Sequence, residues 1–304
     1  MDLSAELKAY GPGATKAPSL AESRAYCRQL AESHYENFTV VSRLVPRYLY
    51  PHFCSVYAYC RWADDLADET HDPAKSLELL DWWEQSLHSA TRGEARHPVF
   101  VALAETMREF ELSEEPFLDL LTAFRRDQRQ NRYATFAELL DYCRCSANPV
   151  GRIVLKLGRC YTDENVTLSD SICTGLQLAN FWQDVQRDFA IGRVYVPLED
   201  LRKHGVELDA LAGPANDDLR ELLRFECNRA ADYLRAGEAL VGRVSNDLRL
   251  SVRLFIDGGA TILQAIEQQR FDVWSRRPTI SKFAKLQLVT RAWLATRFLR
   301  PPSG

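Results

Sequence analysis

The sequence lacks the features that mark several common classes of protein. No window approaches the roughly 18 uncharged apolar residues that a membrane-spanning helix needs. The amino terminus has no charged region followed by an apolar stretch, so we expect neither a signal peptide nor an anchor. No basic run exceeds two residues and the net charge is -4, which argues against a nucleic-acid partner. We therefore expect a cytoplasmic protein.

Two short motifs are also missing. No GxGxxG fingerprint is present to hold a dinucleotide, so we predict that the protein uses no NAD(P)H. CxxC pairs are absent as well, although the chain contains eight cysteines. Because these cysteines are scattered through helical patterns, we interpret them as small buried hydrophobic residues in a reducing compartment.

Strand-like alternation is scarce. From Leu20 onward apolar residues recur at helical spacing, and only the segment RVYVP at 193–197 alternates like a strand. The pattern predicts an all-α fold. Since neither the composition nor a repeat marks a boundary, we expect one helical domain over residues 21–298. A flexible lead-in at 1–20 and a frayed tail at 299–304 would flank it.

Proline, glycine and polar clusters indicate where the helices begin and end. Pro51 suits the first turn of one helix, and HDP at 71–73 ends it. A second central helix is expected to be capped by Ser169 or Asp170 and to stop at Gly192. Polar segments that separate further helices are TRGEARHP (91–98), LSEEP (112–116) and TDENVTLSD (162–170).

What the chain does have is a line of polar residues along each of two apolar helices. On the first helix, Tyr57, Arg61, Asp64 and Asp68 fall at i, i+4, i+7 and i+11, which is one continuous face. We call this the first acid line. Taken alone, it is equally consistent with a solvated helix surface.

The second acid line has the same length and chemistry. Gln177, Asn180, Asp184 and Asp188 fall at i, i+3, i+7 and i+11 of a segment that is otherwise rich in apolar residues. Each line presents two carboxylates one turn apart, which is enough to bind divalent ions through oxygen.

If both lines face one cavity, their four carboxylates need positive charge between them, because buried uncompensated charges are costly. Oxygen ligands favour Mg²⁺, which binds proteins through a few carboxylates together with substrate phosphates. We therefore predict two or three Mg²⁺ ions bridging a diphosphate. Asn180 adds a neutral oxygen, and Arg61 can bind a phosphate oxygen. None of the six histidines lies on either line, which disfavours a carboxylate-histidine di-iron site.

Six stretches of the sequence resemble the squalene and phytoene synthases. They are HYENFTVVSRLVP (34–46), YAYCRWADDLADE (57–69), YCRCSANPVGRIVL (142–155), QLANFWQDVQRD (177–188), GRVYVP (192–197) and FDVWSRRPTISK (271–282). The paired DxxxD motifs are typical of the superfamily, and HYENF with ANPVG resembles the hydroxysqualene synthase branch of bacterial hopanoid biosynthesis. The resemblance implies an all-α isoprenoid-synthase fold, that of the class I terpenoid synthases, with a central cavity.

The resemblance also implies roles for individual residues. The metal-binding positions of the family match Asp64, Asp68, Asn180, Asp184 and Asp188. The diphosphate-binding positions match Arg61, Gln177, Asn180 and Arg187. Positions near the reacting carbons match Tyr57, Tyr142 and Tyr195, and Phe38 and Asn37 are further catalytic candidates. Residues 147–151 match a small-residue segment that kinks a helix beside the substrate, and Pro149 suits a kink on its own account.

Departures from the family pattern indicate which substrate the implied synthase uses. Tyr35 and Asn37 stand where many condensing members carry the serines that hold a second diphosphate, and Gly258 and Gly259 stand where condensing relatives carry a bulkier segment. These changes favour a member that starts from presqualene diphosphate. Mg²⁺-assisted ionisation, cation rearrangement and capture of water would then give hydroxysqualene. Aromatic faces, with Phe181 a further candidate, would stabilise the cation.

Several alternatives stay open. The chain could instead be a synthase that condenses two prenyl diphosphates head to head, giving squalene, dehydrosqualene or phytoene. Chain elongation is disfavoured because the second motif lacks an adjacent acid pair, and a non-enzymatic helical scaffold would expose both acid lines. The group that accepts the proton from water is a tyrosine, Asn37 or the released diphosphate. Because substrate and product are greasy, transient contact with the inner membrane face is a further expectation.

Overall fold

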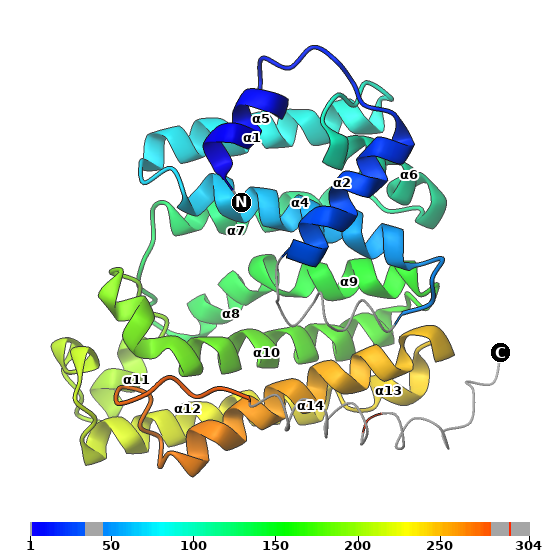
Figure 1. Ribbon diagram of the computed structural model, residues 1–304. Helices are drawn as coiled ribbons and strands as arrows, with labels where there is room; N and C mark the ends of the chain where they lie inside the picture. Colours follow the sequence, from blue (N-terminus) through cyan, green and yellow to red (C-terminus); the bar gives the residue numbers. More distant parts are fainter. Residues whose placement is uncertain (1, 34–44, 281–291, 293–304) are drawn as a thin grey trace. The chain divides into compact units, whose positions relative to one another are not determined.

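The computed structural model describes residues 2–33, 45–280 and 292 (Figure 1). Within these ranges the regular secondary structure is helical, and the one β contact is an isolated parallel bridge between Arg132 and Val194. The predicted all-α fold is therefore confirmed. The strand-like segment at 193–197 supplies Val194 to that bridge and forms no longer strand.

The described residues group into two compact units. Unit 1 contains residues up to 129 together with 156–159, and unit 2 contains residues 130–155 and those from 160 onward. The single domain expected over 21–298 and the frayed tail at 299–304 stay predictions.

Unit 1 is built around helix α4. Large buried rings pack along this helix: Trp62 stacks on Trp83 with ring centroids 5.3 Å apart, and Tyr59 lies edge-on to Phe117 at 5.0 Å. Burial of such large rings removes much apolar surface from water and so helps to hold α4 in place. Helix α4 spans Tyr50–Asp68, and it contacts α2 (Leu20–Ser33), α5 (Pro73–Thr91), α6 (Pro98–Phe110) and α7 (Glu115–Asp127).

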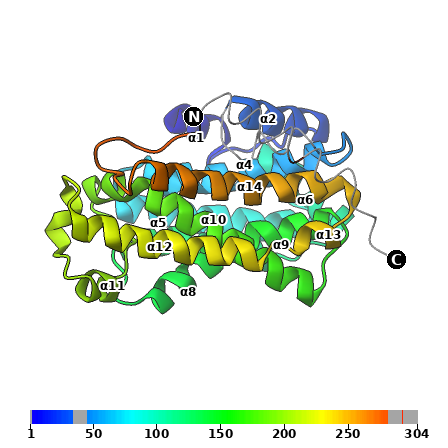
Figure 2. The ribbon, with the colours of Figure 1, turned by 90° about the horizontal axis from the view of Figure 1, so that it is seen from below.

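Three long helices form the body of unit 2. Helices α10 (Asp163–Ala190), α12 (Asp217–Ala236) and α14 (Asn246–Gln268) run alongside one another (Figure 2). The other elements are α8 (Phe136–Ser146), α9 (Asn148–Leu157, whose last residues belong to unit 1), α11 (Leu198–Lys203), the 3-10 helix η1 (Leu208–Ala212) and α13 (Leu240–Arg243).

Glycines let these three helices approach closely around Leu234 of α12. A Cβ added to Gly175 of α10 would lie 2.9 Å from Leu234 Cγ and 3.0 Å from its backbone nitrogen. A Cβ added to Gly259 of α14 would lie 2.8 Å from Leu176 Cδ2 and 3.0 Å from Leu234 Cδ1, whereas one on Gly258 would meet nothing within 4 Å. Gly259 therefore serves helix packing, and of the two adjacent glycines only Gly258 borders open space.

Two sequence-based expectations need correction. Residues 3–10 of the lead-in form helix α1 (Leu3–Tyr10), because the Asp2 side chain accepts a hydrogen bond from the amide of Ala5 and caps the first turn. Helix α10 begins at Asp163 rather than near 170, because Thr162 caps it by accepting from the amide of Asn165. The polar segment at 162–170 is thus its first turns and not a separating loop.

The remaining helix boundaries agree with the turn signals. Pro51 lies in the first turn of α4, and α10 ends two residues before Gly192, which has a positive φ of 82°. The polar segments at 91–98 and 112–116 separate α5, α6 and α7. All eight cysteines are free thiols; five are buried, and Cys60, Cys160 and Cys173 are partly exposed.

Candidate active site

The first acid line lies on a single helix, α4, as its spacing predicts. Tyr57 is buried, with 5% of its surface exposed, while Asp64 is partly exposed and Asp68 is exposed near the carboxyl end of the helix. The line therefore runs from the aromatic core of unit 1 to its surface. The two carboxylates of the line therefore lie at its more exposed end.

Arg61 is held by carboxylates of its own helix. Its guanidinium pairs with Asp64 at 3.3 Å and with Glu69 at 3.8 Å, and it donates a hydrogen bond to Asp65. Asp65 is 1% exposed, so the guanidinium supplies the charge compensation that a buried carboxylate requires. No pattern in the sequence indicated this structural role for Asp65. Arg61 is thus already oriented beside Asp64.

The second acid line lies on α10 and is more enclosed. Asn180 is exposed, whereas the Asp184 side chain is 16% exposed and Asp188 is partly buried. Burial, followed by the neighbouring Asp184 carboxylate, raises the pKa of Asp188 to about 7, against the lowering effect of Arg193, Arg187 and Arg277. Two carboxylates on consecutive turns are therefore under mutual repulsion.

Arg277 is a site residue that sequence analysis missed. Its Nε and NH2 atoms donate to the two carboxylate oxygens of Asp184 at 2.6 and 2.7 Å. The same NH2 group donates to the Gln183 side chain at 3.2 Å, and Gln183 in turn donates to the carbonyl of Pro278 at 2.5 Å. This forked pairing ties the segment after Phe271 to α10. The only signal for it was its position in the stretch FDVWSRRPTISK.

The other diphosphate candidates of unit 2 lie on the same helix. Arg187 has a side chain that is 68% exposed, and its NH1 atom lies 3.5 Å from Asp184 Oδ1. Gln177 is partly buried one turn before Asn180. Gln177 thus lies on the second acid line and Arg187 directly precedes Asp188 on the same helix, while their role in diphosphate binding stays a prediction.

An aromatic cluster lies beside the second acid line. Phe181 of α10 stacks on Tyr195 with ring centroids 3.8 Å apart and an interplanar angle of 10°. Tyr142 lies 6.2 Å from Phe181 and 5.9 Å from Tyr195, and Tyr133 lies 5.5 Å from Tyr142 and 5.9 Å from Tyr195. Sequence analysis singled out three of these rings and missed Tyr133. Since Phe181 precedes Asp184 by one turn, carboxylates and ring faces are presented by neighbouring positions of one helix.

The predicted kink at 147–151 is a complete break between two helices. Helix α8 ends at Ser146 and α9 starts at Asn148, with Ala147 outside helical geometry at φ -122° and ψ -48°. The Thr174 hydroxyl of α10 donates to the Asn148 side chain at 3.1 Å. A Cβ on Gly151 would clash with Ser169 and lie 2.6 Å from the sulfur of Cys173, so only glycine lets α9 approach α10 this closely.

Some predicted site residues are not tested by these contacts. Asn37 and Phe38 lie outside the described residues. The first acid line belongs to unit 1 and the second to unit 2, and the prediction that they face one cavity stays a prediction.

The donors of the second acid line suit a hard cation. Asp184, Asp188 and Asn180 present carboxylate and amide oxygens, which are the ligands that Mg²⁺ favours. A cation would also offset the repulsion that raises the pKa of Asp188. In the described part of the chain no group of three or more His, Cys, Asp and Glu side chains is arranged to hold a metal. Mg²⁺ usually takes several of its ligands from water and a bound phosphate.

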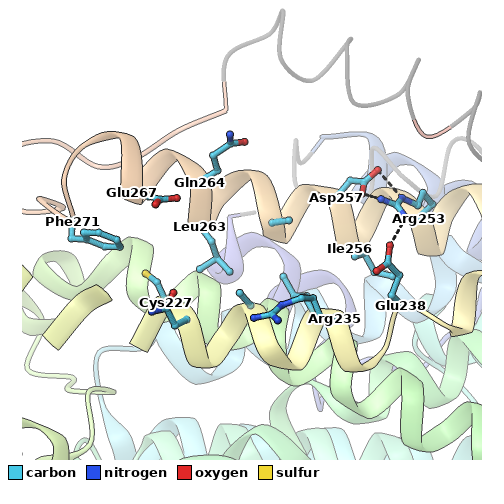
Figure 3. Close-up of a pocket in the computed structure, with 14 residues that line it drawn as sticks. Cys227, Arg235, Glu238, Arg253, Ile256, Asp257, Leu263, Gln264, Glu267 and Phe271 are labelled. Carbon is cyan, nitrogen blue, oxygen red and sulfur yellow. Dashed lines mark hydrogen bonds and ion pairs between the residues drawn. The ribbon is translucent and has the colours of Figure 1, made fainter. Parts of the chain in front are cut away.

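A groove elsewhere on unit 2 contains none of the predicted site residues. It lies between α12 and α14, has a volume of about 340 Å³, and includes Cys227, Leu263 and Phe271 in its lining (Figure 3). At one end Arg253 pairs with Glu238 at 2.8 Å and with Asp257 at 2.6 Å. The charged side chains of the lining are two bases and three acids, so the groove offers no net positive charge for a diphosphate: Arg235, Arg253, Glu238, Asp257 and Glu267.

None of the helices in the described ranges is long and apolar enough to cross a membrane. This agrees with the absence of a long apolar run in the sequence.

Comparisons with known proteins agree with the fold and with the motifs. A family model described as squalene/phytoene synthase matches residues 31–284. A phytoene synthase of Arthrospira platensis is 32% identical over 92% of this chain and 95% of its own length. A hydroxysqualene synthase of Sinorhizobium fredii is 35% identical over 77% of this chain and 80% of its own. The crystal structure of squalene synthase HpnC from Alicyclobacillus acidocaldarius is 46% identical, covers 83% of this chain and 96% of its own, and superposes with a TM-score of 0.80.

Proposed function

This chain belongs to the squalene/phytoene synthase family and is an isoprenoid synthase, and we propose that it is a hydroxysqualene synthase acting on presqualene diphosphate. The proposal is supported by the 35% identity to a hydroxysqualene synthase and by the 46% identity to HpnC. It also rests on Tyr35 and Asn37, which replace the serines of many condensing members.

The observation that carries the proposal is the second acid line with its adjacent rings. Asp184 and Asp188 lie one turn apart on α10, and Phe181, one turn before Asp184, stacks on Tyr195 at 3.8 Å. A diphosphate held at the carboxylate end of this line has its carbon chain beside ring faces. The arrangement suits a reaction that separates a diphosphate anion from a carbocation.

In this proposal Asp64 and Asp68 of unit 1 hold Mg²⁺ together with Asn180, Asp184 and Asp188 of unit 2. When bound, two or three Mg²⁺ ions supply Lewis-acid stabilisation of the charge that develops on the departing diphosphate. Binding sites for the diphosphate oxygens are contributed by Arg61, Gln177, Asn180 and Arg187.

The chemical steps balance without a further co-reactant. The carbon–oxygen bond of presqualene diphosphate breaks, and diphosphate leaves with the electron pair. The remaining cyclopropylcarbinyl cation rearranges, water adds its oxygen to the rearranged cation, and one proton is lost to give hydroxysqualene. Ring faces of Tyr57, Tyr142, Phe181 and Tyr195 each stabilise a nearby cation by about 1 to 2 kcal/mol when water is excluded. Asn37, a tyrosine or the released diphosphate accepts the proton.

The site of action follows from the substrate. Presqualene diphosphate and hydroxysqualene both carry long hydrocarbon chains, so we propose a cytoplasmic protein that contacts the inner membrane face transiently. Flotation of the purified protein with liposomes tests this point, and a protein that stays in the bottom fraction with and without substrate would contradict it.

A head-to-head condensing synthase is the second candidate. The 32% identity to a phytoene synthase over nearly the whole chain favours it. Such an enzyme consumes farnesyl or geranylgeranyl diphosphate alone, whereas a hydroxysqualene synthase requires presqualene diphosphate.

Product analysis by mass spectrometry separates these functions. We expect presqualene diphosphate to give an acyclic C30 alcohol, and we expect chelation of Mg²⁺ to abolish its formation. Asp184→Asn should remove the activity, while Asp163→Asn, an exposed acid in the first turn of the same helix, should retain it. Consumption of farnesyl or geranylgeranyl diphosphate without presqualene diphosphate would favour the condensing alternative.

A further inference from the structure

Two segments of unit 2, residues 131–136 and 193–200, lie side by side and lead into the first turns of α8 and α11. We call them the paired segments. Tyr133 and Tyr195 of the aromatic cluster lie on them, one on each. Their backbone hydrogen bonds run from the amide of Val194 to Asn131 at 2.7 Å, from Leu198 to Tyr133 at 3.0 Å, and from Glu199 to Ala134 at 3.0 Å.

Arg229 of α12 contacts the last residue of each paired segment, Phe136 and Asp200. The Cζ atom of Arg229 lies 3.8 Å from the ring centroid of Phe136, the first residue of α8, and 4.4 Å from that of Phe225. Its NH1 and NH2 atoms donate to the carboxylate of Asp200, in the first turn of α11, at 2.9 and 3.4 Å. One guanidinium thus contacts the end of each paired segment, from a third helix.

The buried acids around Arg229 require a cation at this position. The Asp200 side chain is 5% exposed, so its charge depends on the guanidinium. Glu226 lies 3.3 Å from Arg229 and is fully buried, and burial raises its pKa to about 9. Glu226 is therefore a neutral acid at pH 7, so the Asp200 carboxylate is the anion that pairs with the Arg229 guanidinium. Only arginine combines a planar face for ring stacking with a fork for a carboxylate.

We propose that Arg229 is a positioning residue of the reaction, holding Tyr133 and Tyr195 in the aromatic cluster through Phe136 and Asp200. The proposal rests on the proposed function, because the cluster matters to catalysis only if a cation forms beside it. When the aromatic cluster is held in place, its ring faces point toward the cation and exclude water until the rearrangement is complete. When the cluster is loosened, water enters early and adds to a different carbon of the cation.

The structural part is tested by hydrogen exchange measured by mass spectrometry. In Arg229→Gln we expect the amides of the paired segments, Val194, Leu198 and Glu199 among them, to exchange about tenfold faster. Arg220→Gln is the matched control, since Arg220 is also on α12 and pairs with Asp272 at 2.9 Å but contacts neither segment. Unchanged exchange in Arg229→Gln, or an equal increase in Arg220→Gln, overturns the proposal.

The catalytic part is tested by turnover and product ratio. We expect Arg229→Gln to lower kcat about tenfold with KM nearly unchanged and to raise the fraction of prematurely captured alcohols, with Arg229→Lys in between. Faster exchange with an unchanged product ratio would overturn the positioning role while leaving the proposed function in place. If the unmodified protein converts no presqualene diphosphate, the proposed function fails, and the positioning role in that reaction is overturned with it. If Arg229→Gln does not fold, Arg229→Lys provides both measurements.

Discussion

The close packing of α10 on α12 makes Gly175, the one glycine of the candidate-site helix α10, sensitive to substitution. A Cβ at this position would lie 2.9 Å from Leu234 Cγ and 3.0 Å from the Leu234 backbone nitrogen, both well inside van der Waals contact. The backbone atom cannot move away by a change of rotamer, so α10 and α12 must separate. Overpacking of this kind costs about 1 to 3 kcal/mol.

Gly258 provides the comparison that isolates this cost. It also lies in the interior of a long helix, α14, but an added Cβ meets nothing within 4 Å. Replacement of a helical glycine by alanine stabilises a helix by about 1 kcal/mol, and this gain is common to both positions. We therefore expect Gly258→Ala to raise the free energy of unfolding by about 1 kcal/mol. Gly175→Ala should lie about 1 to 3 kcal/mol below Gly258→Ala.

Urea denaturation followed by far-UV circular dichroism measures the difference. A second measurement places Gly175→Ala in a Leu234→Ala background, where the smaller side chain leaves room for the new methyl group and the penalty should shrink. Equal stability of Gly175→Ala and Gly258→Ala would refute the argument, because the steric conflict with Leu234 would then have no energetic consequence.

Three further predictions concern charge. Burial lowers the pKa of His97 from 6.5 to about 3, so on acidification the unfolded chain binds the proton before the folded chain does. The contribution of neutral His97 to the free energy of unfolding is therefore fully present above about pH 6.5 and falls by about 1.4 kcal/mol per pH unit below it. Urea unfolding at different pH values should show that His97→Asn removes this part of the pH dependence. Asp188→Asn should lower Mg²⁺-dependent turnover on the order of 100-fold, and near-normal turnover would exclude Asp188 as a ligand. Arg277→Gln frees Asp184 from its forked ion pair and should tighten Mn²⁺ binding, measured by calorimetry, about tenfold. The control Arg187→Gln should change Mn²⁺ binding less than about threefold, because Arg187 is exposed and its contact with Asp184 is longer. Equal effects of the two substitutions would contradict a specific role for Arg277.

Much of the fold was accessible from local patterns. Apolar spacing predicted helices, and Pro51 and Gly192 marked boundaries, because first-turn prolines and left-handed glycines act within a few residues. The start of α10 was missed because its first two turns, 163–170, are mostly polar, and Val166 and Leu168 are too few to show an apolar face. Thr162 as the cap was hidden among several equally suitable side chains.

The candidate site was accessible only in part. Spacing placed Asp184 and Asp188 on one face of a helix, since that relation depends on 3.6 residues per turn alone. Arg277 could not be found in this way, because it reaches Asp184 from 93 residues further along the chain. Tyr133 joined the cluster for the same reason, through the pairing of segments that are far apart in sequence.

The amino-acid sequence by itself determined the helical class, the two acid lines and the family, because these depend on local spacing and on motifs. The tertiary structure alone decided which cation meets Asp184, which rings surround Tyr195, and which of two adjacent glycines is indispensable for packing. Those relations are set by how distant helices pack, and a one-dimensional pattern contains no distances between them.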